Sequence, residues 1–182
     1  MNFKVADIDK NLVKRCLQDD AMAQRELYDK YKKAMYTIAY RISNDQDLAA
    51  DILQETFIKV FNNLNQYRKE ASLGAWIKQI LVRTAIYMVK QQKKFEEITE
   101  QNTNTWTNEE VITWPENLTG TTLHHAIQSL PTGYRTIFLL IEVEGFTHKK
   151  AAEMLGISEG TSKSQLFYAK KMLRKKLITQ NN

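Results

Sequence analysis

The sequence has few of the residues that build cross-links and turns, and no long apolar run. It contains one cysteine, two prolines and six glycines among 182 residues. One cysteine allows no intrachain disulfide, which favours a reducing, cytoplasmic setting. No apolar stretch approaches the ~20 residues that a membrane span needs, and the N-terminus has no apolar signal core, so we expect no membrane insertion. So few turn-forming residues are hard to reconcile with a β-sandwich or barrel, and they suit helices joined by short connections.

Motifs of common enzymes and metal sites are also missing. The sequence contains no glycine-rich phosphate loop, no HExxH and no CxxC pair. His124, His125 and His148 have no ligand partners at metal spacing. Cys16 has no local context that would supply a base, so we expect a packed thiol. We therefore predict that the protein is not an enzyme and binds no metal or cofactor.

Charge is plentiful but unevenly distributed along the chain, which has a net charge of +5. Residues 1–95 hold 17 basic and 11 acidic residues, and residues 121–182 hold nine and four. Between them, residues 96–120 hold six glutamates and no lysine or arginine. Basic blocks attract polyanions because binding releases counterions from phosphates. From charge alone, nucleic-acid binding and an ordinary solvated surface are equally open.

Hydrophobic spacing predicts that residues 8–95 are helical, with a polar loop at residues 65–74 between two of the helices. Leu53, Phe57 and Leu64 recur on one side of a helix in this block. The polar residues 43–45 are expected to break the chain between two helices and to cap the second one.

The acidic strip has no sustained hydrophobic period and is rich in threonine, asparagine and glutamate, so we predict a linker at residues 96–120. Trp106 and Trp114 are unusual in a free linker and suggest that it docks on this protein or on a partner. Three or four short helices are expected to follow. The predicted fold is all-α, with two small helical domains, residues 1–95 and 121–182, joined by the acidic linker.

The C-terminal block has the spacing of a helix-turn-helix. Ala152 allows two helices to cross closely, Gly156 suits a turn with positive φ, and Ser158 can cap the second helix. Inward-facing positions recur at helical spacing in that helix, at Ser162, Leu166, Ala169 and Leu173. Its outward or flanking face suits hydrogen bonds to bases, thymine methyl contacts and phosphate binding. A plain helical hairpin with a solvated lysine face is the simpler alternative. The outward or flanking residues are predicted to be Lys163, Ser164, Phe167, Tyr168, Lys170 and Lys171.

Both blocks resemble one known family. The stretch LPTGYRTIFLLIEVEGFTHKKAAEMLGISEGTSKSQLFYAKKMLRKKL resembles the fourth domain of bacterial sigma factors of the extracytoplasmic-function (ECF) group of the sigma-70 family. The segments DLAADILQETFIKVFNNLNQYR and SLGAWIKQILVRTAIYMVKQQKK resemble parts of the second domain of that family. The resemblance covers roughly residues 8–178, in the family's order. It implies an alternative RNA polymerase sigma factor, which is a dissociable subunit that directs transcription initiation.

The resemblance also implies partners. In the family, the second domain binds a coiled coil of the largest subunit of core polymerase and opens the −10 element. The fourth domain binds the −35 element and rests on the polymerase flap, and the linker threads the RNA-exit path, where its glutamates can mimic RNA. Free members are commonly held by an anti-sigma factor. The acidic pattern that meets the coiled coil, where opposite charge gives steering and register, matches Asp47, Asp51, Gln54 and Glu55.

The promoter-binding residues that the resemblance implies fall in both blocks. A loop that takes up an extruded base and a helix that faces the promoter supply the −10 contacts. The −35 contacts come from the helix-turn-helix and from cations near it. The −10 candidates are Tyr67, Arg68, Ser72, Gln79, Arg83, Tyr87 and Lys90. The −35 candidates for base contacts are Thr161, Lys163, Ser164, Phe167 and Tyr168. The −35 candidates for phosphate contacts are Lys149, Lys170, Lys171 and Arg135.

Departures from the family pattern bear on promoter choice. Arg83 stands where the family often has asparagine, and Tyr87 stands where a small polar or acidic residue is usual. One hypothesis is that promoter choice is partly delegated to another DNA-bound partner. Two rival functions also stay open. One is a helix-turn-helix regulator that binds DNA without being a polymerase subunit, and the other is a protein-interaction module with an incidental basic surface.

Overall fold

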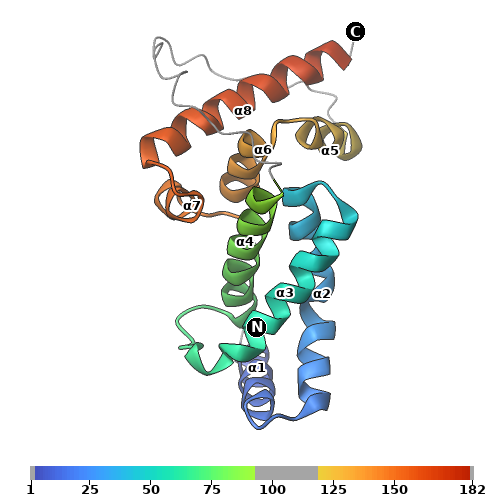
Figure 1. The fold of residues 1–182 in the computed structure, drawn as a ribbon, viewed down its shortest axis with the longest axis vertical. Helices are drawn as coiled ribbons and strands as arrows, with labels where there is room; N and C mark the ends of the chain where they lie inside the picture. The colour runs from blue at the N-terminus through green and yellow to red at the C-terminus, as the bar shows by residue number, and fades with distance from the viewer. Residues whose placement is uncertain (1–2, 93–118, 181–182) are drawn as a thin grey trace. The chain divides into compact units, whose positions relative to one another are not determined.

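A computed structural model describes residues 3–92 and 119–180 of the chain (Figure 1). These residues form helices and short connections with no strand, which confirms the predicted all-α fold. The chain divides into two compact units, Met1–Met88 and Val89–Asn182, called here the first and second unit. Within the described ranges, no helix has both the length and the apolar character that crossing a bilayer requires. The glutamates and tryptophans of the predicted linker lie outside the described residues, and the domain limits at 95 and 121 stay a prediction.

The first unit is built from long helices that pack side by side. Its central helix α2 contacts both α1 and α3. The predicted apolar stripe of Leu53, Phe57 and Leu64 is buried, which confirms the face that was expected to enter the core. Its elements are α1 (Phe3–Cys16), α2 (Ala21–Ser43), α3 (Gln46–Asn62), the short 3-10 helix η1 (Leu64–Gln66) and α4 (Leu73–Gln91), whose last residues belong to the second unit.

Short polar residues determine where α2 and α3 begin and end. The Asp20 carboxylate accepts hydrogen bonds from the backbone N–H groups of Met22 and Ala23, at 2.9 and 3.1 Å, and so caps α2. Asn44 ends this helix with a left-handed φ of 56°, and the Asp45 carboxylate caps α3. The break and cap predicted at residues 43–45 are therefore confirmed.

Asp20 is expected to make the stability of the protein depend on pH. The hydrogen bond from the Ala23 N–H, followed by that from the Arg15 side chain, lowers the pKa of Asp20 below its ordinary value. A carboxyl group with a depressed folded pKa stabilises the fold above its unfolded pKa, and this contribution is lost as pH falls through the folded pKa. We expect Asp20→Asn, which keeps a cap acceptor, to unfold at a lower temperature than the wild type at neutral pH. The difference should shrink below about pH 4. Thermal unfolding followed by circular dichroism checks this, and a difference that stays constant down to pH 3 would contradict it.

The second unit packs three shorter helices and a π-helical turn around one long helix. The long helix, α8 (Glu159–Gln180), contacts α5 (Gly120–Gln128), α6 (Thr132–Phe138) and α7 (His148–Leu155). The apolar run at residues 137–141 is helical, but α6 passes into the π-helix η3 (Leu139–Val143) within it. The spacing of the apolar residues does not indicate this change in helix type.

The turn between α7 and α8 has the predicted helix-turn-helix features. Gly156 ends α7 with a φ of +71°, a conformation that glycine adopts without steric cost. The Ser158 hydroxyl accepts a hydrogen bond from the Thr161 N–H at 2.9 Å and caps α8. Ala152 is buried, as a close crossing of two helices requires. The predicted inward-facing residues of α8 are buried as well: Ser162, Leu166, Ala169 and Leu173.

Candidate functional site

The α3 helix presents acidic and amide side chains on its exposed face. Asp47, Asp51 and Gln54 are exposed, and Glu55 is half-buried one turn after Asp51. The Glu55 carboxylate forms an ion pair with Lys59 at 3.2 Å. The Lys59 ammonium also lies 3.4 Å from the Thr84 hydroxyl on α4 and so links the two helices. The structure thus brings the predicted polymerase-binding residues together along one helix.

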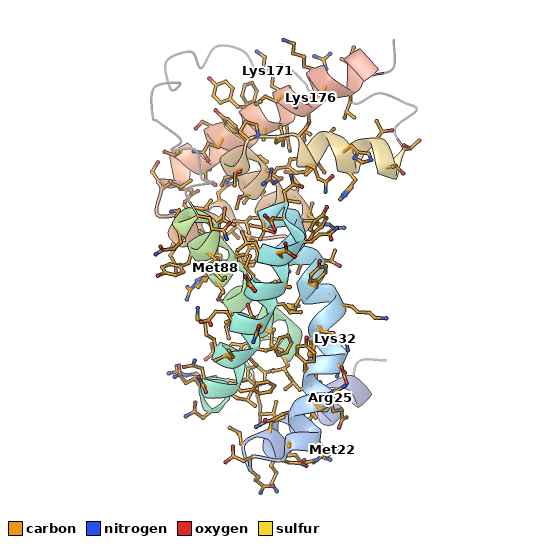
Figure 2. The ribbon with its side chains drawn as sticks, turned by 45° about the vertical axis from the view of Figure 1, so that its right-hand side comes forward. Met22, Arg25, Lys32, Met88, Lys171 and Lys176 are labelled. Carbon is orange, nitrogen blue, oxygen red and sulfur yellow. The ribbon has the colours of Figure 1, made fainter. Side chains whose placement is uncertain are left out.

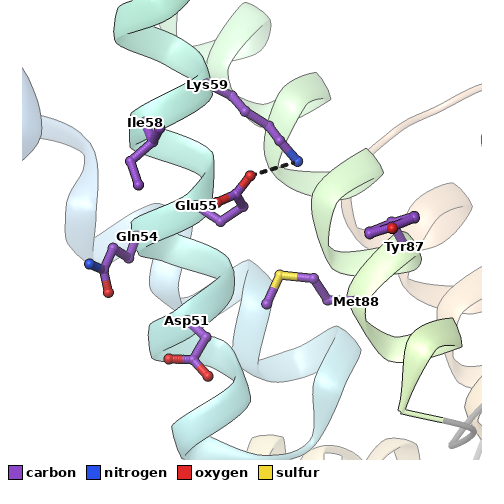
Figure 3. Close-up of a pocket in the computed structure, with 7 residues that line it drawn as sticks. All are labelled: Asp51, Gln54, Glu55, Ile58, Lys59, Tyr87 and Met88. Atoms are coloured by element: carbon purple, nitrogen blue, oxygen red, sulfur yellow. Dashed lines mark ion pairs between the residues drawn. The ribbon is translucent and has the colours of Figure 1, made fainter.

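A groove of about 430 Å³ runs between α3 and α4 within the first unit (Figure 3). Met88 extends from α4 towards α3, into the space between the two helices (Figure 3). Ile58 and Tyr87 line the groove with large apolar surfaces and are 49% and 60% exposed. Sequence reasoning missed this groove. Its complete lining is Asp51, Gln54, Glu55, Ile58, Lys59, Tyr87 and Met88.

The loop before α4 is held by its own side chains. The Tyr67 hydroxyl donates to the Ala71 carbonyl at 2.7 Å, and its ring lies 5.5 Å from the Trp76 ring. Burial raises the pKa of Tyr67 above its ordinary value. The Ser72 hydroxyl accepts a hydrogen bond from the Ala75 N–H at 3.2 Å at the start of α4. Tyr67 and Ser72 therefore fix the shape of the loop, and Arg68 is exposed on it.

The other −10 candidates lie along α4 at spacings of three and four residues, which place them on one side of a helix. Arg83, Tyr87 and Lys90 are exposed, and Gln79 is half-buried. Of these four residues, Tyr87 alone lines the groove between α3 and α4.

The predicted −35 residues of α8 include cations that already hold carboxylate partners. The exposed Lys163 forms an ion pair with Glu159 at 2.9 Å, four residues earlier on the same helix. Lys170 is half-buried and forms an ion pair with Glu142 of the π-helical turn at 2.8 Å. Lys171 is exposed (Figure 2). Both paired lysines must exchange a carboxylate for a nucleic-acid group if they bind DNA.

Aromatic and hydroxyl groups accompany these cations. The rings of Phe167 and Tyr168 are half-buried and meet edge to face, with centroids 5.6 Å apart. The Thr161 hydroxyl lies 2.7 Å from that of Ser158 at the start of α8. Lys149 is exposed on α7. Near the far end of α8, the Lys176 ammonium donates to the Ser129 carbonyl at 2.9 Å and ties the helix to the end of α5 (Figure 2).

Two of the predicted −35 residues are not where the sequence analysis placed them. Arg135 is 4% exposed, and its guanidinium donates to the carbonyls of Gln128 and Leu130 at 3.2 and 3.0 Å. Burial lowers the pKa of Arg135 below its ordinary value. A guanidinium held in the core this way is not placed to reach a phosphate, which argues against the predicted phosphate contact. Ser164 is 5% exposed and donates to the Thr161 carbonyl at 3.0 Å, so its predicted place on the outward or flanking face is wrong.

Comparison with known proteins gives consistent matches in both halves of the chain. The family models for Sigma-70 region 2 and Sigma-70, region 4 match residues 27–95 and 121–173. RNA polymerase sigma factor SigV of Bacillus subtilis is 29% identical over 151 residues, which cover 83% of this chain and 89% of that protein. The ECF RNA polymerase sigma-E factor of Haemophilus influenzae is 28% identical over 180 residues, which cover 93% of this chain and 95% of that protein.

A solved structure has the same fold over most of its length. The sigma factor RpoE, in complex with the anti-sigma factor NepR from Bartonella quintana, matches with a TM-score of 0.56 and 24% identity. The match covers 84% of this chain and 95% of that one.

A helix-turn-helix in one unit and an acidic helix in the other are typical of all-helical proteins that bind DNA in transcription. The matches to region 2 and region 4 of Sigma-70, in the family's order, identify which DNA-binding family this is. The chain belongs to the sigma-70 family of RNA polymerase sigma factors, in its ECF group, and is an alternative sigma factor for transcription initiation.

Proposed function

We propose that this sigma factor binds core polymerase through α3 and promoter DNA through α4, its preceding loop and α8. Residues 1–95 and 121–182 serve as the two functional domains. The observation that carries the proposal is the separation of charge between helices, with exposed carboxylates on α3 and exposed lysines on α8. Because the polymerase performs the chemistry, the work of this chain is recognition and positioning.

The acidic residues of α3 give the polymerase contact its steering and register. Asp47 and Asp51 lie one turn apart and are exposed to solvent. Carboxylates spaced along one helix attract a basic helix over a distance and favour one sliding position once the two touch. A basic coiled coil of the largest polymerase subunit is the partner of matching chemistry.

The −35 element is read by α8 lying in the major groove. Lys163 is well placed to donate to guanine O6 and N7, after its ammonium leaves Glu159. The Phe167 ring suits a thymine methyl group, and Thr161 and Tyr168 supply hydroxyl groups on the same helix. Lys149, Lys170 and Lys171 contact phosphates, which position the helix without specifying sequence. Ser164 is left out of this set because it is buried.

The −10 element is opened and held by the loop before α4 and by α4 itself. Tyr67 and Ser72 shape the loop through their hydrogen bonds, which leaves Arg68 to meet the extruded strand. Arg83 and Lys90 supply cations along α4, and Gln79 supplies an amide for base contacts.

Two features of the biological setting belong to the same proposal. The chain works in the cytoplasm, where the polymerase is, and an anti-sigma factor holds it when it is not needed. Support for such a partner comes from the structural neighbours, since RpoE and CnrH were both solved in complexes with partner proteins, NepR and the cytosolic domain of CnrY.

Run-off transcription tests the proposed function. Core polymerase is incubated with genomic promoter fragments, with and without the full chain, and the transcripts are mapped to their start sites. We expect discrete starts only when the chain is present, preceded by a shared −35 and −10 pattern. Failure of the purified chain to form a complex with bacterial core polymerase would contradict the proposal, whatever its affinity for DNA.

Two lysines of α8 are expected to have different roles in DNA binding, one in overall affinity and the other in the choice of −35 sequence. Lys171→Ala should weaken binding to all duplexes alike and reduce the slope of log affinity against log salt by about one, because it removes one phosphate contact. Lys163→Ala should change which −35 sequence is preferred, at a cost of about 1–3 kcal/mol in discrimination. Fluorescence anisotropy of the full chain with core polymerase and labelled −35 duplexes at several salt concentrations measures both. A uniform loss over all duplexes for Lys163→Ala would show that it does not read bases.

A further inference from the structure

The groove between α3 and α4 combines apolar walls with an acidic rim. Ile58 on α3 and Tyr87 on α4 are among the large apolar residues that stay exposed, and both line it. Asp51 and Glu55 line the same groove from α3 (Figure 3). The feature is thus amphipathic, and its two walls come from segments about thirty residues apart in the sequence.

We propose that this groove receives an apolar side chain from a basic helix of core polymerase, and that Tyr87 is a polymerase contact rather than a promoter contact. The inference rests on the proposed function, because it assigns a further part of the surface by which the sigma factor holds the polymerase. It extends that surface from the carboxylates of α3 across to α4.

The charge of the rim selects the occupant. Asp51 and Glu55 repel the phosphates of a DNA strand and attract lysine and arginine side chains. Lys59, a cation that lines the groove, is paired with Glu55 at 3.2 Å and lies against Thr84 of α4. Lys59 therefore neutralises the charge of Glu55, and the remaining carboxylate of Asp51 makes the rim negatively charged. A basic helix is the complementary partner.

The apolar and acidic lining of the groove suits an amphipathic helix better than a strand of nucleic acid. An amphipathic helix laid in a groove inserts apolar side chains as anchors and keeps its polar residues at the rim. Met88 supplies a flexible side chain that adapts to the inserted group. Tyrosine is enriched among the interface residues whose replacement by alanine causes the largest losses of binding free energy. Its large ring provides contact area and loses little conformational entropy on binding.

The neighbouring residue Arg83 limits how far the groove extends along α4. It lies one turn before Tyr87, is exposed, and does not line the groove. A promoter strand that follows the cations of α4 meets Arg83 without entering the acidic groove. The two residues that depart from the family pattern on α4 thus have separate partners, DNA for Arg83 and protein for Tyr87.

The test measures polymerase binding and promoter use separately for variants of the full chain. Affinity for core polymerase is measured by titration of fluorescently labelled sigma factor. We expect Tyr87→Ala and Ile58→Ala each to weaken it about tenfold, the loss typical of an interface anchor. Tyr87→Phe should keep most of the affinity because it keeps the ring. At saturating sigma factor, where all the polymerase is bound, Tyr87→Ala should use the same −10 sequences as the wild type.

Two further variants serve as controls. Leu17→Ala removes another exposed apolar side chain of the first unit, outside the groove, and should bind core polymerase like the wild type. Arg83→Ala should alter −10 use and leave polymerase affinity unchanged. Unfolding midpoints are compared for all variants, and a loss of affinity counts only where the midpoint is kept.

The outcomes distinguish this inference from the proposed function. If Asp51→Lys loses polymerase binding while Tyr87→Ala and Ile58→Ala bind normally, the groove assignment is wrong and the proposed function stands. If Tyr87→Ala binds polymerase normally but changes −10 use, Tyr87 is a promoter residue. If the wild-type chain fails to bind core polymerase, both proposals fail together.

Discussion

Replacing Asp51 by lysine is expected to lower the affinity of the chain for core polymerase by about 100-fold, which corresponds to about 2.7 kcal/mol. Asp51 lies in the middle of the exposed acidic face of α3 and lines the groove next to it. A lysine there places like charges opposite each other at the interface with a basic helix. Leaving a buried interfacial charge without its partner costs about 2–5 kcal/mol. Titration of labelled sigma factor with core polymerase at several salt concentrations measures the loss.

The same substitution should leave the fold intact, which makes the result specific. Asp47, Asp51 and Glu55 are spaced four residues apart, so their carboxylates repel one another along one side of α3. Lysine at position 51 turns both repulsions into attractions, and lysine has a higher helix propensity than aspartate. We therefore expect the unfolding midpoint of Asp51→Lys to equal or exceed that of the wild type. A lower midpoint would mean that the binding loss reflects damage to the helix.

A matched control separates this local effect from a change in total charge. Glu26→Lys makes the same charge change on α2, where the exposed Glu26 carboxylate pairs with Arg15 at 3.1 Å. Exposed ion pairs contribute little to stability. We expect this variant to bind core polymerase almost as well as the wild type, with the same dependence on salt. Equal losses for the two variants would show that overall charge, and not the α3 face, governs binding.

Local signals in the sequence correctly predicted the break between α2 and α3 and the turn of the helix-turn-helix. Asn44 and Asp45 end one helix and cap the next, and Gly156 and Ser158 do the same at the turn before α8. These features depend on hydrogen bonds between residues two to four positions apart, so a short stretch of sequence contains all the information they need.

Features that depend on contacts between distant segments were missed or misplaced. Periodicity indicates which face of a helix is apolar, but not which other helix lies beside it, so the groove that Ile58 shares with Tyr87 was not foreseen. The Lys163–Glu159 pair follows from i,i+4 spacing, whereas the Lys170–Glu142 pair requires the fold of the whole second unit.

Arg135 illustrates the same limit in a single residue. An arginine near a DNA-binding helix is ordinarily read as a surface cation, because arginine is seldom fully buried. Here α5 ends just before α6 begins, and the carbonyls at that end need hydrogen-bond donors inside the protein. The Arg135 guanidinium supplies them to Gln128 and Leu130. The sequence shows the arginine, but the carbonyls it satisfies become visible only in the fold.

Arg135→Ala is therefore expected to destabilise the second unit by about 3 kcal/mol, because the two carbonyls lose their donor and a buried side chain is removed. Arg135→Met, which restores most of the apolar volume but no donor, should recover only part of this loss. Amide hydrogen exchange followed by mass spectrometry measures the effect unit by unit. Peptides from α6 and α8 should exchange faster in both variants, and peptides from α2 should exchange as in the wild type.

DNA-binding measurements, taken together with hydrogen exchange, decide between a structural role and a phosphate contact for Arg135. At low temperature, where the variant stays folded, the salt slope of −35 duplex binding should be unchanged in Arg135→Ala. In Lys171→Ala the slope should fall by about one, with hydrogen exchange as in the wild type. These two opposite patterns follow from burial alone, since a guanidinium held by backbone carbonyls in the core releases no counterion from DNA. A reduced slope with normal exchange in Arg135→Ala would instead mean that the guanidinium leaves the core to reach a phosphate.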